Sequence, residues 1–184
     1  MKRDHVLATA ERLFYEEGFF GTGVDRVIAE AGVARMTLYK HFKSKDNLVL
    51  AVLDRRADAY WAQLEQAVSQ ARENGHSACR ALVAAHGDWL LGEGRHGCLF
   101  LKALGEYAAQ EPAVTQRVVA EKKRLCDRME VLLTEEGHAH APALAVQLML
   151  LLEGATALVP VMEAKGVVTQ LRAAASQLLE VRSG

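Results

Sequence analysis

Apolar residues recur at helical spacing along almost the whole chain, and this periodicity is what most limits the possible folds. The 184 residues include three prolines, and no stretch of strand length alternates apolar and polar residues convincingly. Apolar positions separated by three and four residues are typical of amphipathic helices. The sequence therefore predicts an all-α protein with about nine helices.

Glycines, prolines and capping residues set the expected helix boundaries, with Thr22 as the expected cap of the second helix and Ser77 as that of the fifth. The expected helices are 6–17, 22–32, 35–43, 46–73, 77–91, 99–109, 112–134, 142–164 and 167–181. No linker rich in Pro, Gly or Ser separates the two halves of the chain, so we place the domain boundary inside the long fourth helix. We expect an N-terminal three-helix domain over residues 1–52 and a C-terminal helical domain over residues 53–184.

A short basic segment lies within an otherwise neutral chain. Net charge is −1, yet residues 33–45 contain Arg35, Lys40, Lys43 and Lys45 and no acidic residue. Any contact with nucleic acid must therefore be local. The alternative interpretation is a solvated basic face on an ordinary three-helix module.

The helix expected over residues 35–43 has two different faces at 100° per residue. Leu38 and Phe42 lie four residues apart and point into a small core. Met36, Thr37 and Lys40 lie on the opposite side, where an apolar probe, a methyl-bearing hydroxyl and a cation suit a DNA major groove. On this basis the second helix and the third resemble a helix-turn-helix, with a turn at a glycine between them.

The segment from about Val6 to Leu53 resembles the N-terminal domain of the TetR (tetracycline repressor) family of bacterial transcriptional regulators. The resemblance rests on LATAERLFYEEGFFGTGV, IAEAGV and TLYKHFKSKDNL. It covers about a quarter of the chain strongly. Two positions depart from the family pattern: Ala34 stands where serine is frequent, and Met36 stands where a small residue, often glycine, is common.

The resemblance implies a homodimer that binds a near-palindromic double-stranded operator with one recognition helix per half-site. The positions that it assigns to DNA contact are Arg35, Met36, Thr37, Tyr39, Lys40 and His41, with Thr22 and Lys45 on backbone-contact positions. It also implies a C-terminal domain that binds an unidentified small effector, so a ligand-responsive repressor is expected. A same-fold activator, a regulator without a ligand, and an all-α enzyme or binding module remain alternatives.

The middle helices carry candidates for an effector pocket. A helical bundle can enclose a mostly apolar cavity with a few polar groups. The candidate lining residues are His86, Trp89, Phe100, Leu104, Tyr107, Met129 and Leu133. Each of them, taken alone, also fits plain core packing.

The last two expected helices carry more apolar surface than one partner helix usually buries, so we expect them to form the dimer interface as a four-helix arrangement. The candidate interface residues are Leu148, Leu151, Leu152, Ala155, Leu158 and Val159. Residues 143–162 are also long and apolar enough to cross a bilayer. We interpret this stretch as a helix buried on nearly all sides in a bundle or an interface, because it contains Gln147 and Glu153 and lacks a basic flank.

The remaining chemistry-bearing residues do not form a recognisable catalytic or metal site. His138 with His140 would supply two ligands, too few for a tetrahedral metal, as would His96 with Cys98. The three widely spaced cysteines indicate reduced thiols in a cytoplasmic protein. We expect no cofactor and no enzyme activity, and leave open whether Cys98 senses oxidants or electrophiles.

Overall fold

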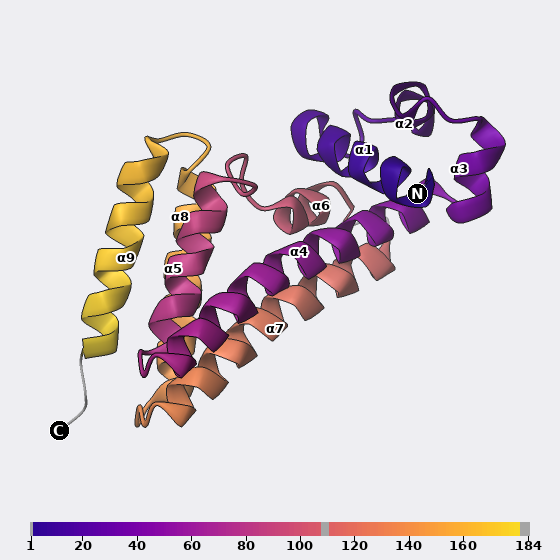
Figure 1. Ribbon diagram of the computed structural model, residues 1–184. Coiled ribbons are helices and arrows are strands. Elements are labelled where there is room, and N and C mark those ends of the chain that lie inside the picture. Colours follow the sequence, from indigo (N-terminus) through magenta and orange to yellow (C-terminus); the bar gives the residue numbers. More distant parts are fainter. Residues whose placement is uncertain (1, 108–110, 181–184) are drawn as a thin grey trace. The chain divides into compact units, whose positions relative to one another are not determined.

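The computed structural model describes residues 2–107 and 111–180, and within these residues it contains nine helices and no strand (Figure 1). The helices are α1 (Lys2–Glu17), α2 (Val24–Ala31), α3 (Arg35–His41), α4 (Lys45–Glu73), α5 (Ala78–Leu91), α6 (Leu99–Tyr107), α7 (Pro112–Glu135), α8 (Ala141–Leu158) and α9 (Ala164–Glu180). The all-α prediction is confirmed. The predicted helix ends at residues 109 and 181 lie outside the described residues.

Packing divides the chain into two compact units. The first contains Met1–Ala59 with Leu99–Ala120, and the second contains Tyr60–Cys98 with Glu121–Gly184. Both α4 and α7 contribute residues to each unit. This division assigns α6 and the first part of α7 to the same unit as α1–α3, whereas the sequence placed them in the C-terminal domain. A functional boundary at residues 52 and 53 stays a prediction.

The first unit has a small aromatic and aliphatic core beneath α1, α2 and α3. Phe14 and Phe19 stack with ring centroids 5.0 Å apart, and Leu13, Leu38 and Leu48 are fully buried. Helix α1 packs on both α2 and α3. Apolar burial of this kind orients short helices that would be marginal in isolation.

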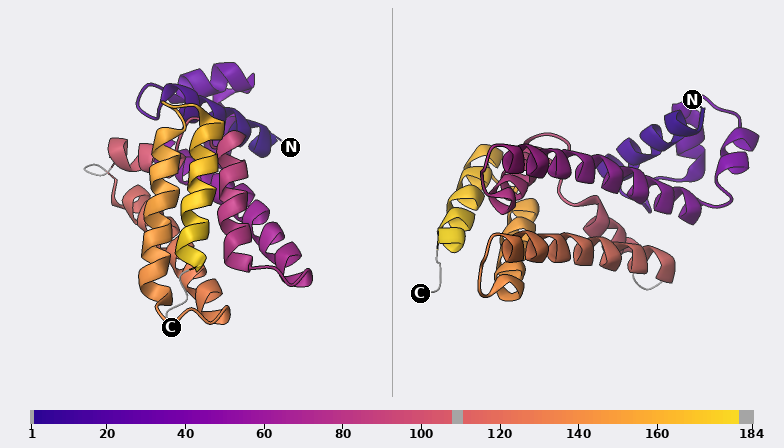
Figure 2. Two further views of the ribbon diagram at one scale, coloured as in Figure 1. Left: turned by 90° about the vertical axis from the view of Figure 1, so that its left-hand side faces the viewer. Right: turned by 60° about the horizontal axis from the view of Figure 1, so that its bottom comes forward.

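The second unit is built around α5, α8 and α9, which lie side by side (Figure 2). Their shared core includes Leu82, Leu90, Leu148 and Leu152. Ser77 caps α5 as expected, because its side chain accepts a hydrogen bond from the Arg80 N–H at 3.1 Å.

The boundary between the last two helices was predicted wrongly. Helix α8 ends at Leu158, and α9 begins at Ala164, so Gly166 lies in the first turn of α9 rather than after α8. The reason is local: Pro160 follows the end of α8, and the Glu163 carboxylate accepts N–H groups of Lys165 and Gly166. Glu163 thus caps the new helix.

Helix α8 is long and apolar enough to cross a membrane by length and composition, but only 33% of it is buried in this chain. The expectation of a helix buried on nearly all sides is therefore not met by one chain alone. The described part of α8 has one buried face and one apolar face in solvent.

Candidate nucleic-acid interface

The turn between α2 and α3 is fixed by a glycine in the left-handed region. Gly32 has φ 59° and ψ 34°. Its N–H donates to the Ala29 carbonyl at 3.3 Å, and the Val33 N–H donates to the Ile28 carbonyl at 3.3 Å. These bonds close the end of α2 and start the chain toward α3.

Two buried apolar side chains pack α3 onto the core of the first unit. Leu38 is fully buried and Phe42 is nearly so, as their spacing predicted. The Arg3 guanidinium lies 5.4 Å from the centroid of the Phe42 ring. The helix ends at His41, two residues before the predicted end, because Phe42 turns to an extended conformation. Ala34 begins α3 without a side-chain cap.

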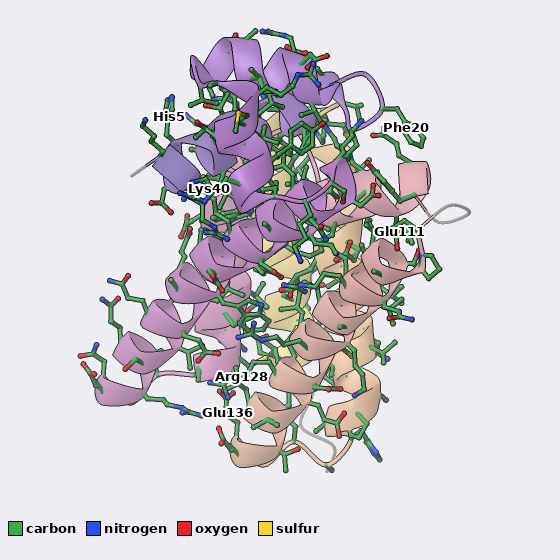
Figure 3. The ribbon with its side chains drawn as sticks, turned by 90° about the vertical axis from the view of Figure 1, so that its right-hand side faces the viewer. His5, Phe20, Lys40, Glu111, Arg128 and Glu136 are labelled. Carbon is green, nitrogen blue, oxygen red and sulfur yellow. The ribbon has the colours of Figure 1, made fainter. Side chains whose placement is uncertain are left out.

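The opposite face of α3 is open to solvent. Met36 is 85% exposed and Tyr39 is 41% exposed, and Lys40 and His41 are also exposed. Figure 3 labels Lys40 on this part of the first unit. Thr37 is half-buried. The structure therefore places the apolar side chain of Met36, the phenol of Tyr39 and the ammonium of Lys40 on one surface, as the helical spacing predicted.

The cations of α3 differ in how far they are paired. Arg35 forms an exposed ion pair with Asp25 on α2. Within residues 2–107 and 111–180, Lys40 and Lys43 have no acidic partner. Lys40 is therefore free to meet a phosphate, whereas Arg35 would first have to leave Asp25.

One of the predicted phosphate contacts needs correction, and the other stays a prediction. Thr22 is fully buried and does not cap α2; its hydroxyl donates to the Gly18 carbonyl at 2.7 Å and contacts the Leu13 carbonyl at 3.4 Å. Its side chain is therefore unavailable to DNA. Lys45 lies in the first turn of α4 and is half-buried, and burial lowers its pKa.

The candidate effector residues fall into both units. Phe100, Leu104 and Tyr107 belong to the first unit, where Tyr107 packs edge-on against Phe19 with centroids 5.9 Å apart. The other four, which are His86, Trp89, Met129 and Leu133, belong to the second unit and are buried there. The seven residues therefore do not line one pocket within a single unit.

His86 is part of a buried polar chain that the sequence did not predict. The Tyr60 hydroxyl lies 2.7 Å from His86 Nδ1, and His86 Nε2 lies 3.1 Å from Thr156 Oγ1. Because Thr156 donates its own hydrogen to the Leu152 carbonyl, Nε2 must donate and Nδ1 must accept from Tyr60. Burial lowers the pKa of His86 to about 4 and raises the pKa of Tyr60. Tyr60 was missed because its spacing fits an ordinary apolar stripe.

Cys98 differs from the other two thiols in its surroundings. The Lys122 ammonium donates to Cys98 Sγ at 3.3 Å and pairs with Glu153 at 2.6 Å. Burial alone would lower the pKa of Lys122, but the neighbouring thiol and carboxylate raise it. Cys79 is buried, and its pKa is raised to about 12.

Four of the six candidate interface residues face the protein's own interior. Leu148, Leu152, Ala155 and Val159 are buried, because that side of α8 packs on α9 and α5. Leu151 is half-buried, and Leu158 is 44% exposed. The large apolar residues that face solvent on and just after α8 are Val146, Leu150, Leu158, Val161 and Met162.

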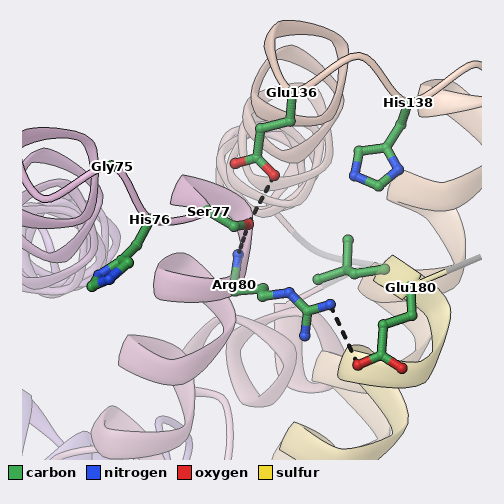
Figure 4. Close-up of a pocket in the computed structure, with 8 residues that line it drawn as sticks. Gly75, His76, Ser77, Arg80, Glu136, His138 and Glu180 are labelled. Carbon is green, nitrogen blue, oxygen red and sulfur yellow. Dashed lines mark hydrogen bonds and ion pairs between the residues drawn. The ribbon is translucent and has the colours of Figure 1, made fainter. Parts of the chain in front are cut away.

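A polar pocket of about 460 Å³ lies among the ends of α5, α7 and α9 (Figure 4). Glu136 accepts hydrogen bonds from Ser77 Oγ at 2.8 Å and from the Cys79 N–H at 2.9 Å, so this carboxylate is committed to capping α5. His138 also lines the pocket. In the described part of the chain, no group of three or more His, Cys, Asp or Glu residues could hold a metal ion.

Comparison with known proteins agrees with the helix-turn-helix geometry. Residues 6–52 match the family model described as bacterial regulatory proteins, tetR family. The transcriptional activator FasR of Mycolicibacterium smegmatis is 35% identical over 89 residues, which are 48% of this chain and 40% of FasR. The transcriptional repressor NemR of Escherichia coli is 33% identical over 72 residues, which are 39% of this chain and 36% of NemR. These matches span less than half the length of either relative.

Solved structures extend the likeness to the whole chain. The crystal structure of SCO4454, a TetR-family transcriptional regulator from Streptomyces coelicolor, is 33% identical with a TM-score of 0.91. That alignment covers 100% of this chain and 90% of SCO4454. The reduced form of E. coli NemR has the same fold, with a TM-score of 0.81 at 21% identity over the full length of both chains. The relatives are regulators rather than enzymes, and the chain belongs to the TetR family of bacterial transcriptional regulators.

Proposed function

We propose that the chain is a cytoplasmic, ligand-responsive repressor that binds a palindromic DNA operator as a homodimer. The observation that carries the proposal is the solvent face of α3, which presents Met36, Tyr39 and Lys40 from a helix anchored by Leu38 and Phe42. A helix of this kind, second in a helix-turn-helix, suits insertion into the major groove.

Roles within this face follow from the chemistry of each side chain. Lys40 supplies a cation for phosphates, and the imidazole of His41 and the phenol of Tyr39 can each donate a hydrogen bond to a phosphate oxygen. Met36 is almost fully exposed and suits contact with a thymine methyl group. Arg35 and Thr37 complete the proposed contacts, and Lys45 contributes at the edge.

The dimer interface in this proposal is the outer apolar surface of α8 and α9. A groove of about 450 Å³ runs there between Leu150, Leu158, Met162 and Val167. Leu150 is 69% exposed and Met162 is 59% exposed in the single chain. A second copy of the same two helices would cover this surface by a two-fold interface.

The second unit is the proposed effector site, with His86, Trp89, Met129 and Leu133 as candidate contacts. The buried chain through Tyr60 and His86 offers polar groups among apolar neighbours, which favours a small, mostly apolar effector with a polar end. An effector that binds one arrangement of the dimer more tightly would shift its population and lower DNA affinity by that difference.

Activation is the second candidate, because FasR is named an activator and NemR a repressor. The direction of control depends on where the operator lies relative to the promoter. A reporter gene driven by the chain's own upstream DNA separates the two: loss of the regulator raises output under repression and lowers it under activation.

Selection of a random-sequence duplex library on the purified protein tests the DNA-binding proposal. We expect enrichment of an inverted repeat, bound by two protomers per duplex in sedimentation. The Tyr39→Ala variant should bind the selected duplex roughly tenfold more weakly, in line with the loss of one good contact. Recovery of no enriched sequence from the wild-type protein would contradict the proposal.

A further inference from the structure

The chain turns a sharp corner between α1 and α2, and one carboxylate from α6 occupies it. Gly18 has φ +83°, and the N–H groups of the next two residues, Phe19 and Phe20, both donate to the same carboxylate. Glu106 Oε1 accepts from Phe19 at 3.0 Å, and Oε2 accepts from Phe20 at 2.5 Å. Successive N–H groups beside a left-handed residue form an anion-binding concavity.

A second contact lies one helical turn earlier on α6. Lys102 is four residues before Glu106, so both side chains lie on one face. Its ammonium donates to the Tyr15 carbonyl at 2.8 Å and lies 4.8 Å from the centroid of the Tyr15 ring. Tyr15 is in the last turn of α1, where carbonyls lack helical partners and a cation is favourable. Helix α6 therefore contacts the end of α1 through Lys102 and the corner that follows α1 through Glu106.

Aromatic packing closes the same corner. Tyr107 lies against both Phe19 and Phe20, with ring centroids 5.9 Å and 5.5 Å away. Phe20 is 51% exposed and projects from the corner (Figure 3). A Cβ atom at Gly18 would lie 3.3 Å from Glu106 Oε1, so the carboxylate approaches the backbone closely.

The corner leads directly into the helix-turn-helix. Thr22, just before α2, donates its hydroxyl to the Gly18 carbonyl at 2.7 Å. The backbone that Glu106 holds is thus the backbone from which α2 starts, and α2 in turn contacts α3. We propose that Glu106, supported by Lys102, is a positioning residue that fixes α2 and α3 for DNA binding. This inference rests on the proposed DNA-binding function.

The sign of the expected effect separates positioning from electrostatics. Glu106 is an anion in the DNA-binding unit, so removing its charge should leave DNA affinity unchanged or raise it if the residue has no positioning role. The Glu106→Gln side chain has the same shape but only one oxygen acceptor, and its amide group would face a backbone N–H. A positioning role therefore predicts weaker binding despite the lost negative charge.

The experiment compares full-length Glu106→Gln with Glu16→Gln, which removes an equal charge from an exposed pair with Arg12 in the same unit. Two quantities are measured: amide hydrogen exchange at Phe19 and Phe20, and affinity for the selected duplex at several salt concentrations. We expect Glu106→Gln to exchange these amides roughly tenfold faster and to bind DNA roughly tenfold more weakly, as loss of a charge-assisted hydrogen bond implies. The salt slope should not change, because no phosphate contact is lost.

Each other outcome counts against the inference. Unchanged exchange at Phe19 and Phe20 would show that Glu106 does not hold the corner. Faster exchange with unchanged DNA affinity would show that the corner does not position α2 and α3. If the wild-type protein enriches no duplex, the proposed function fails. Amide exchange at Phe19 and Phe20 then still shows whether Glu106 holds the corner. Should Glu106→Gln not fold, Glu106→Asp keeps the charge but withdraws the carboxylate from the Phe19 and Phe20 N–H groups, and the same two measurements decide.

Discussion

The two compact units use polar side chains in opposite ways. In the first unit, Lys40 and His41 point into solvent from a helix whose buried face is apolar. In the second, Tyr60, His86 and Thr156 form a hydrogen-bonded chain inside the core. Exposed charges contribute little to stability and are available to a partner. Buried polar groups must be satisfied within the protein, so changing them acts on stability before it acts on recognition.

The largest expected effect is the loss of folding stability at acid pH that His86 causes in the second unit. The pKa of folded His86 is lowered from 6.5 to about 4, so between these values the unfolded chain binds a proton that the folded chain does not. The stability contributed by neutral His86 is complete above pH 6.5 and is lost as pH falls to about 4. The loss amounts to about 3 kcal/mol in the free energy of unfolding.

Denaturant unfolding of wild type and His86→Gln across this pH range measures that contribution. The stability difference between the two proteins should shrink toward acid pH, whereas the exposed His140→Gln control should stay parallel to wild type. Parallel curves for His86→Gln would show that His86 does not titrate as a buried neutral side chain.

A smaller effect is expected in thiol reactivity. The Lys122 ammonium donates to Cys98 Sγ at 3.3 Å, whereas burial raises the pKa values of Cys79 and Cys126. N-ethylmaleimide should therefore modify Cys98 several-fold faster than Cys126, because the thiolate is the reactive form and burial disfavours it at Cys126. Peptide mass spectrometry over time gives the order, and Lys122→Met should remove the difference. Faster labelling of Cys126 would contradict this assignment.

The smallest expected effect on DNA affinity concerns Arg35, which is paired with Asp25, whereas Lys40 has no acidic partner among the described residues. Asp25→Asn removes the partner of Arg35 and one negative charge beside α3. We expect roughly threefold tighter binding to the selected duplex, the size expected for an exposed ion pair. Fluorescence anisotropy at fixed salt provides the measurement, with Glu16→Gln as the charge control. Weaker binding by Asp25→Asn would show that the pair itself orders Arg35 for DNA.

The sequence predicted the features that depend on residues close together along the chain, such as the buried face of a helix or a helix cap. The spacing of Leu38 and Phe42 gave the buried side of α3, and Ser77 was correctly placed as a cap. Local patterns also gave wrong predictions. Thr22 has the position of a helix cap, but its hydroxyl donates to the Gly18 carbonyl in the corner between α1 and α2. Gly166 looks like a helix end, but Glu163 caps α9 before it.

Contacts between distant residues could not be predicted from one sequence. Tyr60, His86 and Thr156 come from three helices and share no local motif, so their chain appears only when the helices pack. The same holds for Glu106 and Phe19, which are 87 residues apart. On α8 the apolar residues outnumber what one face can bury, so the sequence could not tell its interior side from its solvent side.

The most direct test of the account is the salt dependence of DNA binding by Lys40→Ala. Lys165→Ala, which removes an equal exposed charge from the second unit, is the matched control. We predict that Lys40→Ala weakens binding to the selected duplex roughly tenfold and lowers the slope of log affinity against log salt by about one. Lys165→Ala should match wild type in both. Equal affinities and slopes for all three proteins would contradict the assignment of the α3 surface to DNA.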